Sequence, residues 1–428
     1  MKKFLVLMAV LAFACMGTVV YANGIAQSSH FTAKHIGGMN DNTGDETAMY
    51  DPASTVWLKD GIYINVSNIT AFEGIEAKAG GTTLKGETTA FVLPSVSFLY
   101  KQAEFAGFLY VNVLDGAPFT SLKWDDGTPY TNSLAAGIYL LTSTNAGAPT
   151  VATSSNSKVD AESYTYNATL GGSYKINDMF SLALGIRYVI SKTKVDIDAS
   201  ATGAVGTYSA NIINEEKANG YGGLIGLNIV PAHGYLIGIT YSTAVKREYE
   251  ENVNATVSGS GAVFGNALVQ AGMLSTLEAE DGEKVREDLP AMATLTAAGM
   301  PVMGTVIALQ INYMFNKQAD WEGAEDEVDN DIVYMLALTQ FLSKELRFSV
   351  GIMYADKGSN DKIVSPTGTD VNPALDELGF GIGGAYSINE NINVALTYSY
   401  TYFLEGELGS EKLNRTRNLV AVQVGYKM

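Results

Sequence analysis

The residue types that most often carry chemistry are scarce in this chain and do not form a reactive set. The three histidines, His30, His35 and His233, lie at spacings that fit no metal site. No Ser/His/Asp or Cys/His arrangement suited to nucleophilic catalysis can be assembled from the sequence. We therefore expect a protein that is not an enzyme, with no catalytic residue, no metal and no cofactor.

Two further patterns resemble binding motifs but lack the surroundings that such motifs need. Residues 325–331 are acidic and offer a loose calcium site, but without EF-hand spacing a solvated charge run is the favoured interpretation. Residues 379–384 satisfy the dinucleotide pattern G-x-G-x-x-G, yet no βαβ unit surrounds them. We expect Gly379, Gly381 and Gly383 to share one face of a strand, where the absence of side chains gives space to a plug segment of the chain.

Apolar residues alternate with small or polar ones through most of the chain from Gly61 onward. From Phe180 to Ile190 every second residue is large and apolar, and the residues between include Ser181 and Arg187. Successive side chains of a strand point to opposite faces, so each such segment has one apolar and one more polar face. The pattern predicts fourteen strands, near residues 61–70, 87–100, 105–114, 162–175, 179–194, 217–230, 234–246, 288–299, 304–316, 330–342, 345–356, 376–387, 391–404 and 415–428.

The connections between these segments alternate between very short and long. Residues 176–178 and 388–390 are short and rich in turn formers, whereas 115–161, 195–216 and 247–287 are long. Outer-membrane barrels have short periplasmic turns, longer extracellular loops, an apolar exterior and a polar interior. We therefore predict an all-β fold, a 14-stranded antiparallel transmembrane β-barrel, rather than a soluble sandwich.

The first residues have the features of a signal peptide, which indicates export. Lys2 and Lys3 precede an apolar run too short to span a bilayer, and Val20 to Ala22 form a small-residue cleavage pattern. We expect cleavage after Ala22, with a lipid-modified Cys15 as the open alternative. Cleavage after Ala22 leaves no cysteine in the mature chain, which excludes disulfides and thiolate metal sites.

Charge and composition narrow the possibilities further. The net charge of −18 argues against nucleic acid as a partner. No segment after the signal peptide reaches the roughly 18 unbroken apolar residues of a membrane-spanning helix. No linker divides the chain after Gly61, so residues 61–428 are expected to form one barrel.

Residues 41–60 do not alternate and instead resemble the N-terminal plug segment of the FadL-type long-chain fatty acid transporter family. Gly44, Asp45 and Ala48 correspond to the family's Gly-Asp-Asp-Ala-like run, and Asp51-Pro52-Ala53 to its Asn-Pro-Ala signature. Residues 289–292 and 174–185 are similar to further family segments, at the eighth strand and the strand-four-to-five hairpin. The replacement of Asn by Asp51 removes an amide donor and adds a charge.

The resemblance implies a barrel closed by a hatch, residues 23–60, with a lateral opening in its wall. The family has a kinked third strand, which corresponds here to Val113, Leu114, Asp115 and Gly116. A glycine inside a regular strand favours a bulge or bend. The alternative is that Asp115 and Gly116 simply begin the long loop.

That loop is unusually rich in apolar and aromatic residues, which need a partner. We expect residues 135–141 to form a short helix or strand that provides an apolar surface groove for the ligand. The alternative is packing against the protein's own barrel rim. The candidate groove residues are Phe119, Trp124, Tyr130, Ile138, Tyr139, Leu140 and Leu141.

A fatty-acid carboxylate favours a cation in a pocket of low dielectric constant. Alternation places Arg187 in the lumen, whereas Lys192 and Lys194 face outward unless a bulge resets the register. Interfacial lysines also serve as anchors at the membrane surface. The candidates for carboxylate contact are Arg187, Lys192, Lys194, Lys246 and Lys317.

The sequence therefore predicts a monomeric, plugged outer-membrane transporter for hydrophobic small molecules, fatty acids or hydrocarbons. Its expected partners are that ligand, outer-membrane lipid and the outer-membrane assembly machinery. Two alternatives remain: a surface-exposed structural protein or antigen on the same barrel, and a general diffusion porin.

Overall fold

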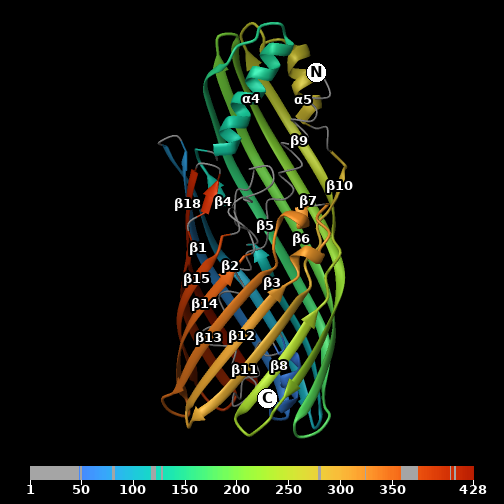
Figure 1. Ribbon diagram of the computed structural model, residues 1–428, viewed down its shortest axis with the longest axis vertical. Helices are drawn as coiled ribbons and strands as arrows, with labels where there is room; N and C mark the ends of the chain where they lie inside the picture. The colour runs from blue at the N-terminus through green and yellow to red at the C-terminus, as the bar shows by residue number, and fades with distance from the viewer. Residues whose placement is uncertain are drawn as a thin grey trace.

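A closed antiparallel sheet forms most of the molecule in the computed structural model, which describes residues 48, 51–79, 82–116, 122–126, 129–277, 281–322, 324–357, 375–404, 406–408 and 411–428 (Figure 1). Fourteen strands of these residues make up the barrel: β1 (Gly61–Ala79), β2 (Thr82–Gln102), β3 (Phe105–Gly116), β5 (Ala152–Lys175), β6 (Phe180–Gly203), β7 (Gly206–Ile229), β8 (Tyr235–Ser242), β11 (Met292–Val302), β12 (Thr305–Met314), β13 (Asp331–Phe341), β14 (Leu346–Asp356), β15 (Glu377–Ser387), β16 (Ile392–Phe403) and β18 (Glu411–Lys427). The predicted 14-stranded antiparallel barrel fold is confirmed.

Shorter elements extend the barrel or lie against it. The additional strands are the three-residue β4 (Leu122–Trp124), β10 (Lys284–Arg286) and β17 (Gly406–Leu408), and the longer β9 (Glu248–Ser260), which pairs with the upper part of β7. The helices are α4 (Pro129–Asn145), α5 (Ala267–Leu277) and the 3₁₀ turns η1 (Pro52–Trp57), η2 (Asn316–Gln318) and η3 (Ala324–Glu327). No helix of the described residues is long and apolar enough to cross a membrane.

The sheet closes because β1 pairs with β18 as well as with β2. Ile62 N–H donates to the carbonyl of Met428 at 2.8 Å, and Met428 N–H donates to the carbonyl of Ile62 at 2.9 Å. Closure leaves neither strand with a free edge, which is the condition for a sheet in a lipid environment.

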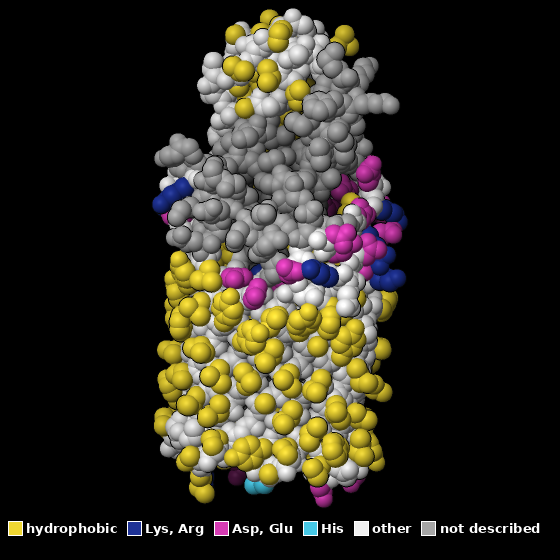
Figure 2. All heavy atoms as spheres, viewed as in Figure 1, with side chains coloured by type: hydrophobic (Ala, Val, Ile, Leu, Met, Phe, Trp, Pro, Cys, Tyr) yellow, Lys and Arg dark blue, Asp and Glu magenta, His cyan; other side chains and the backbone are white. Residues whose placement is uncertain are grey.

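The apolar face of each strand points outward. On β6, Leu184 and Ile186 are 65% and 66% exposed, whereas their neighbours Ala183 and Arg187 are buried. Figure 2 shows hydrophobic side chains over the visible face of the lower barrel, which we call the apolar belt, with charged side chains above it. A soluble sandwich would bury its apolar face, so this arrangement is that of a membrane barrel.

The predicted short turns are formed, and side chains stabilise them. In the turn between β5 and β6, Asn177 Oδ1 accepts the backbone N–H groups of Met179 at 2.8 Å and Phe180 at 3.0 Å. Asn389 does the same for Asn391 and Ile392 in the turn between β15 and β16. Asn side chains that replace a backbone acceptor favour tight turns.

Several segments predicted as long loops are instead strands. β5, β6 and β7 have 24 residues each and extend far above the ends of β11 and β12 (Figure 1). Alternation continues there, with Val195 and Ile197 buried, but the opposite face carries Asp, Ser and Thr, which we read as loop composition. We call this upper part, formed by β5, β6, β7 and β9 with α4 and α5, the extracellular extension.

Candidate functional site

The turn η1 lies inside the lower barrel and is hydrogen-bonded to the three strands β5, β6 and β7. Asn228 Nδ2 donates to Asp51 Oδ2 at 2.6 Å, and Trp57 Nε1 donates to Asn228 Oδ1 at 3.1 Å. Ser181 Oγ donates to the carbonyl of Ala53 at 2.6 Å. A further contact joins the hydroxyls of Thr55 and Ser173 at 2.6 Å. The buried η1 thus occupies lumen space beside β5, β6 and β7.

Glycines on the barrel wall make room for η1. A Cβ on Gly226 would lie 3.3 Å from Pro52 Cγ, and one on Gly238 would lie 2.5 Å from Asp51 Oδ2. Sequence reasoning missed both glycines and pointed instead to the run at 379–383. A Cβ on Gly379 would meet Met353 at 3.1 Å, so a side chain of β14, and not the plug, takes that space.

Three of the five predicted hatch residues lie among the residues that the structure describes. Asp51, Pro52 and Ala53 lie at the start of η1, in the lumen. Gly44 and Asp45 lie outside the described residues. The role of all five as a hatch stays a prediction.

The ladder between β2 and β3 is interrupted part of the way up the wall. The last pair is Ser95 with Asn112, and above it β2 meets only β4, at Gly86 and Glu87. Among the described residues, positions 88–94 of β2 therefore have no strand partner on the β3 side. Pro94, which has no N–H to donate, sits at this break, where a proline is tolerated.

The upper end of β3 bends at the residues expected from the sequence. The β3–β5 register shifts between Val113 and Asp115, which leaves Leu114 as the extra residue of a bulge. Gly116 has φ +69°, and a Cβ there would lie 1.9 Å from the carbonyl oxygen of Ser163. Only glycine fits this position without strain. β3 also ends at Gly116, so the bend and the strand end coincide.

An apolar cluster lines the lumen beside this interruption. It comprises Ile69, Ala71, Ala90, Leu93, Val113, Leu419 and Ala421, with Tyr166 packed against it. We call these residues the wall cluster. Most lumen-facing positions nearby are polar, so an apolar patch next to a gap in the hydrogen-bonded ladder is a place where a hydrophobic molecule can leave water.

Arg187 lies just below the wall cluster and is 7% exposed. Its Nε donates to Asn167 Oδ1 at 3.3 Å, and Tyr110 faces it from β3. Of the carboxylate candidates, Arg187 alone faces the lumen. Alternation sets this orientation, as predicted.

Lys192 and Lys194 face outward, as strict alternation predicts, and Lys246 and Lys317 are exposed, so a contact of any of the four with a ligand carboxylate stays a prediction. Lys192 and Lys194 share the outward face of β6 with Ile190, because no bulge resets the register. Lys246 is exposed beside the buried Val245. Lys317 is half exposed and pairs with Asp329.

Sequence reasoning missed a second group of buried charges higher in the lumen. Glu73 accepts Arg415 Nε at 2.9 Å and Arg417 Nε at 2.8 Å, and Phe403 lies under both guanidinium groups. Lys357 lies 3.5 Å from Glu377, which completes the group. Alternation with Leu419 and Ala421 would have placed both arginines inside.

The groove candidates separate into packed and exposed residues. Tyr139 of α4 is fully buried, with its ring 4.8 Å from that of Phe264, so it belongs to the core of the extracellular extension. Leu140 is 40% exposed, and Ile138 and Leu141 are half-buried. Phe119 lies outside the described residues, and only the backbones of Trp124 in β4 and Tyr130 in α4 are described. Residues 135–141, expected to form a short helix or strand, belong to the longer helix α4; the groove stays a prediction.

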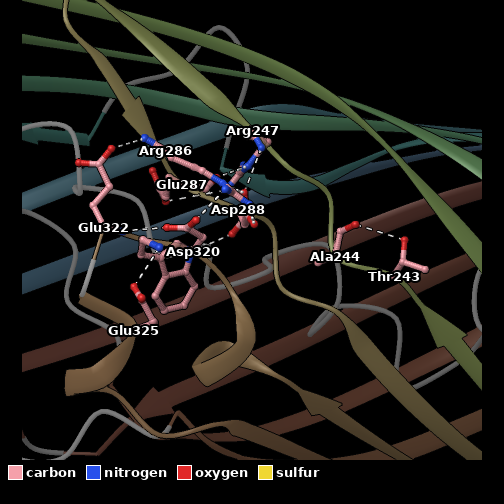
Figure 3. A network of polar contacts seen from close by, with 10 residues as sticks. Thr243, Ala244, Arg247, Arg286, Glu287, Asp288, Asp320, Glu322 and Glu325 are labelled. Carbon is pink, nitrogen blue, oxygen red and sulfur yellow. Dashed lines mark hydrogen bonds and ion pairs between the residues drawn. The ribbon is translucent and has the colours of Figure 1, made fainter.

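A polar network closes the wall where β8 passes into β9 (Figure 3). Arg247 donates to the carbonyl of Glu287 at 2.9 Å and to Ser191 Oγ at 2.9 Å. Arg286 pairs with Asp288 at 3.0 Å and with Asp320 at 2.6 Å (Figure 3). Within the described part of the chain, no three His, Cys, Asp or Glu residues are placed to hold a metal ion.

Two buried carboxylates lie near this network, above the apolar belt. Glu216 of β7 is paired in register with Glu251 of β9. Burial, strengthened by the charges of Glu251 and Glu287, raises the pKa of Glu216 to about 8. Burial, strengthened by Glu283 and Glu322, raises the pKa of Glu251 to about 7.

Comparison with known proteins agrees with this architecture. No protein-family model matches the chain. The long-chain fatty acid transport protein of Escherichia coli O6:H1 is 23% identical over 332 residues, which cover 68% of each chain.

Solved structures are similar over nearly the whole chain. A FadL homologue from Pseudomonas aeruginosa has a TM-score of 0.63 at 13% identity, covering 92% of this chain and 98% of the other. The toluene transporter TodX of Pseudomonas putida has a TM-score of 0.57 at 14% identity, covering 95% and 98%. TbuX, the toluene transporter of Ralstonia pickettii, has a TM-score of 0.57 at 12% identity, covering 95% and 99%. In sequence resemblance and in fold, the chain is therefore similar to the FadL-type transporters.

Proposed function

We propose that this protein is a passive outer-membrane transporter for hydrophobic small molecules. The observation that carries the proposal is the interrupted β2–β3 ladder with the wall cluster behind it. Most of residues 88–94 of β2 pair with β1, but among the described residues none of them has a strand partner on the β3 side, and a gap of this kind beside an apolar surface gives a hydrophobic molecule a way through the wall. The fatty acid and toluene transporters to which the chain is similar support the same class of cargo.

The proposed route leads sideways, because η1 blocks the way down. A ligand enters from the extracellular side, reaches the wall cluster, and leaves through the opening bordered by Val113, Leu114, Asp115 and Gly116. Lateral exit delivers an apolar molecule directly into lipid. No energy source is required, because partition into the bilayer is favourable for apolar surface.

Arg187 is the residue we assign to a ligand carboxylate. It is buried, faces the lumen and lies immediately below the wall cluster. A ligand with its head at Arg187 and its chain against Leu93 and Val113 spans both environments. The apolar groove at Ile138, Leu140 and Leu141 is proposed as an earlier contact near the extracellular end.

The proposed organisation follows the sequence: a signal peptide of residues 1–22 cleaved near Ala22, a hatch of residues 23–60, and the barrel of residues 61–428. The mature chain acts as a monomer in the outer membrane after insertion by the assembly machinery. The filled lower lumen around η1 favours this reading over a general diffusion porin.

Uptake into liposomes that contain the purified protein tests the proposal. We expect a labelled long-chain fatty acid to enter and a hydrophilic sugar to be excluded. Ala90→Trp adds a large side chain to the wall cluster. It should reduce fatty acid uptake about tenfold, because it occupies the space that we propose for the ligand. Ala337→Trp, also buried and lumen-facing but on β13, is the matched control. Equal entry of sugar and fatty acid would exclude the proposed function.

A further inference from the structure

The buried cations of the barrel differ in how their charges are compensated. Each of them except Arg187 has a carboxylate within 4.0 Å. The pairs are Lys101 with Asp60, Arg247 with Glu287, Lys357 with Glu377, and both Arg415 and Arg417 with Glu73. Among the buried lysines and arginines of the described residues, Arg187 alone has no carboxylate within this distance.

A neutral amide occupies the place where a counter-ion is expected. Arg187 Nε donates to Oδ1 of Asn167, which is 1% exposed. Burying an unpaired guanidinium is costly, because its water shell is lost and no negative charge replaces it. This cost falls sharply when an anion binds beside the guanidinium, so the uncompensated charge of Arg187 favours the binding of an anion.

The orientation of this amide is fixed from its other side. Asn167 Nδ2 donates to Asn112 Oδ1 at 2.9 Å and to Thr169 Oγ1 at 3.2 Å. The Thr169 hydroxyl also lies 3.4 Å from Oδ1, so the bond to Asn112 Oδ1, which requires a donor, is the contact that turns the NH₂ group away and Oδ1 toward the guanidinium. Asn112 is also the last β3 residue paired with β2, so the amide is anchored at the lower edge of the opening.

We propose that Asn167 is a positioning residue that sets the substrate class: it holds Arg187 in the lumen without neutralising it, so that the site prefers amphiphiles with an anionic head group over neutral hydrocarbons. This inference rests on the proposed transport function and specifies its cargo. An aspartate at the same position would supply the missing counter-ion, and the site would then accept neutral apolar molecules only.

The test compares an anionic and a neutral probe in the same liposomes. Labelled palmitate and labelled hexadecane have the same chain length and differ in the carboxylate. In Asn167→Asp, palmitate uptake should fall about tenfold or more, which corresponds to the loss of one charged hydrogen bond. Hexadecane uptake should stay within about twofold of wild type, which also shows that the variant is folded.

Asn312→Asp is the matched control, because Asn312 is a buried, lumen-facing amide on β12. It adds the same charge elsewhere and should leave the ratio of palmitate to hexadecane uptake unchanged. In Arg187→Gln, palmitate uptake should be low already, and adding Asn167→Asp should lower it no further, since the two changes act on one charge.

The outcomes separate the inference from the function on which it rests. If the wild-type protein transports both probes and Asn167→Asp has the same ratio of palmitate to hexadecane uptake, the proposed role of Asn167 is wrong. The proposed transport function is not affected by that result. Wild-type protein that transports neither probe would overturn the proposed function itself. An equal loss of both probes in Asn167→Asp, with a folded barrel in gel mobility, would also reject the selectivity claim.

Discussion

The carboxylate of Glu73 on β1 and the guanidinium of Arg417 on β18 meet at 2.8 Å across the line where the barrel closes. Both side chains are buried, and Arg415 binds the other oxygen of the same carboxylate at 2.6 Å. A buried ion pair contributes little net stability, but removing one partner leaves an uncompensated charge. Loss of Glu73 would therefore leave two buried arginines without their shared counter-ion at the closing seam.

Glu73→Gln is expected to destabilise the barrel by about 3–5 kcal/mol, because two buried arginines lose their shared counter-ion. The temperature at which the folded form is lost in semi-native electrophoresis measures the change. Lys85→Gln is the control: its pair with Glu76 is exposed, and its loss should cost no more than about 1 kcal/mol. Similar shifts for both variants would contradict the expectation.

Replacing Gly116 by alanine should distort the upper end of β3. The residue has φ +69° and no room for a Cβ against Ser163, so we expect a cost of about 1–3 kcal/mol and altered fatty acid uptake. Gly74→Ala on β1 is the control, because a Cβ there meets nothing within 4 Å. Unchanged stability and uptake in Gly116→Ala would show that the bend is not required.

The extracellular extension should be less stable at alkaline pH. The folded-state pKa values of Glu216 and Glu251, about 8 and about 7, lie above the ordinary value of 4.5. The folded form therefore binds protons more tightly, and stability falls as pH rises from about 4.5 to about 8, then levels off. Hydrogen exchange of residues 206–217 should be faster at about pH 9 than at about pH 6, after correction for the rise of the intrinsic amide exchange rate with pH.

Glu216→Gln should remove much of this pH dependence, because its side chain cannot ionise. Glu250→Gln, an exposed position on β9, should leave the dependence as it is. Protection that does not change with pH in the wild-type protein would show that neither buried carboxyl group titrates in this range.

Asp51→Asn should hold η1 more firmly. Asp51 is buried, and its Oδ1 has no hydrogen-bond partner, whereas Oδ2 accepts from Asn228 at 2.6 Å. Asparagine keeps that acceptor and removes a buried charge, a gain of about 1–3 kcal/mol. Slower hydrogen exchange of residues 51–58 would report it. Asp178→Asn, at a fully exposed turn, is the control, and faster exchange in Asp51→Asn would contradict the expectation.

Alternation in the sequence was sufficient to predict the fold and the orientation of most lumen residues. It placed Arg187 inside and Lys192 and Lys194 outside, because the period of two holds along β6 without a bulge. It failed at the ends of strands, where polar outer faces in residues 195–203 looked like loop. Membrane-facing and water-facing strands share the same period but differ in the composition of the outer face.

The contacts that define the candidate site could not be read from the sequence. Asn112, Asn167 and Arg187 come from three strands, and their meeting depends on register. Alternation fixes the face of a side chain but not its height relative to a neighbouring strand. The resemblance implied a lateral opening at the third strand, but the stretch of β2 that lacks a partner, residues 88–94, could not be predicted, because it depends on which partner is missing and not on the residues of β2.

An apolar core built around Tyr139, Tyr208 and Phe264 fills the extracellular extension, reaches Ile75 of β1 and Phe403 of β16, and is separate from the wall cluster. At about 3.3 Å per residue, strands of 24 residues reach roughly 80 Å, far more than a bilayer requires. The upper ends of these strands thus extend beyond the membrane-facing part of the barrel. Because the core around Tyr139 and the wall cluster share no residue, a substitution at Tyr139 should alter the shape of the tip and leave the packing of the wall cluster unchanged.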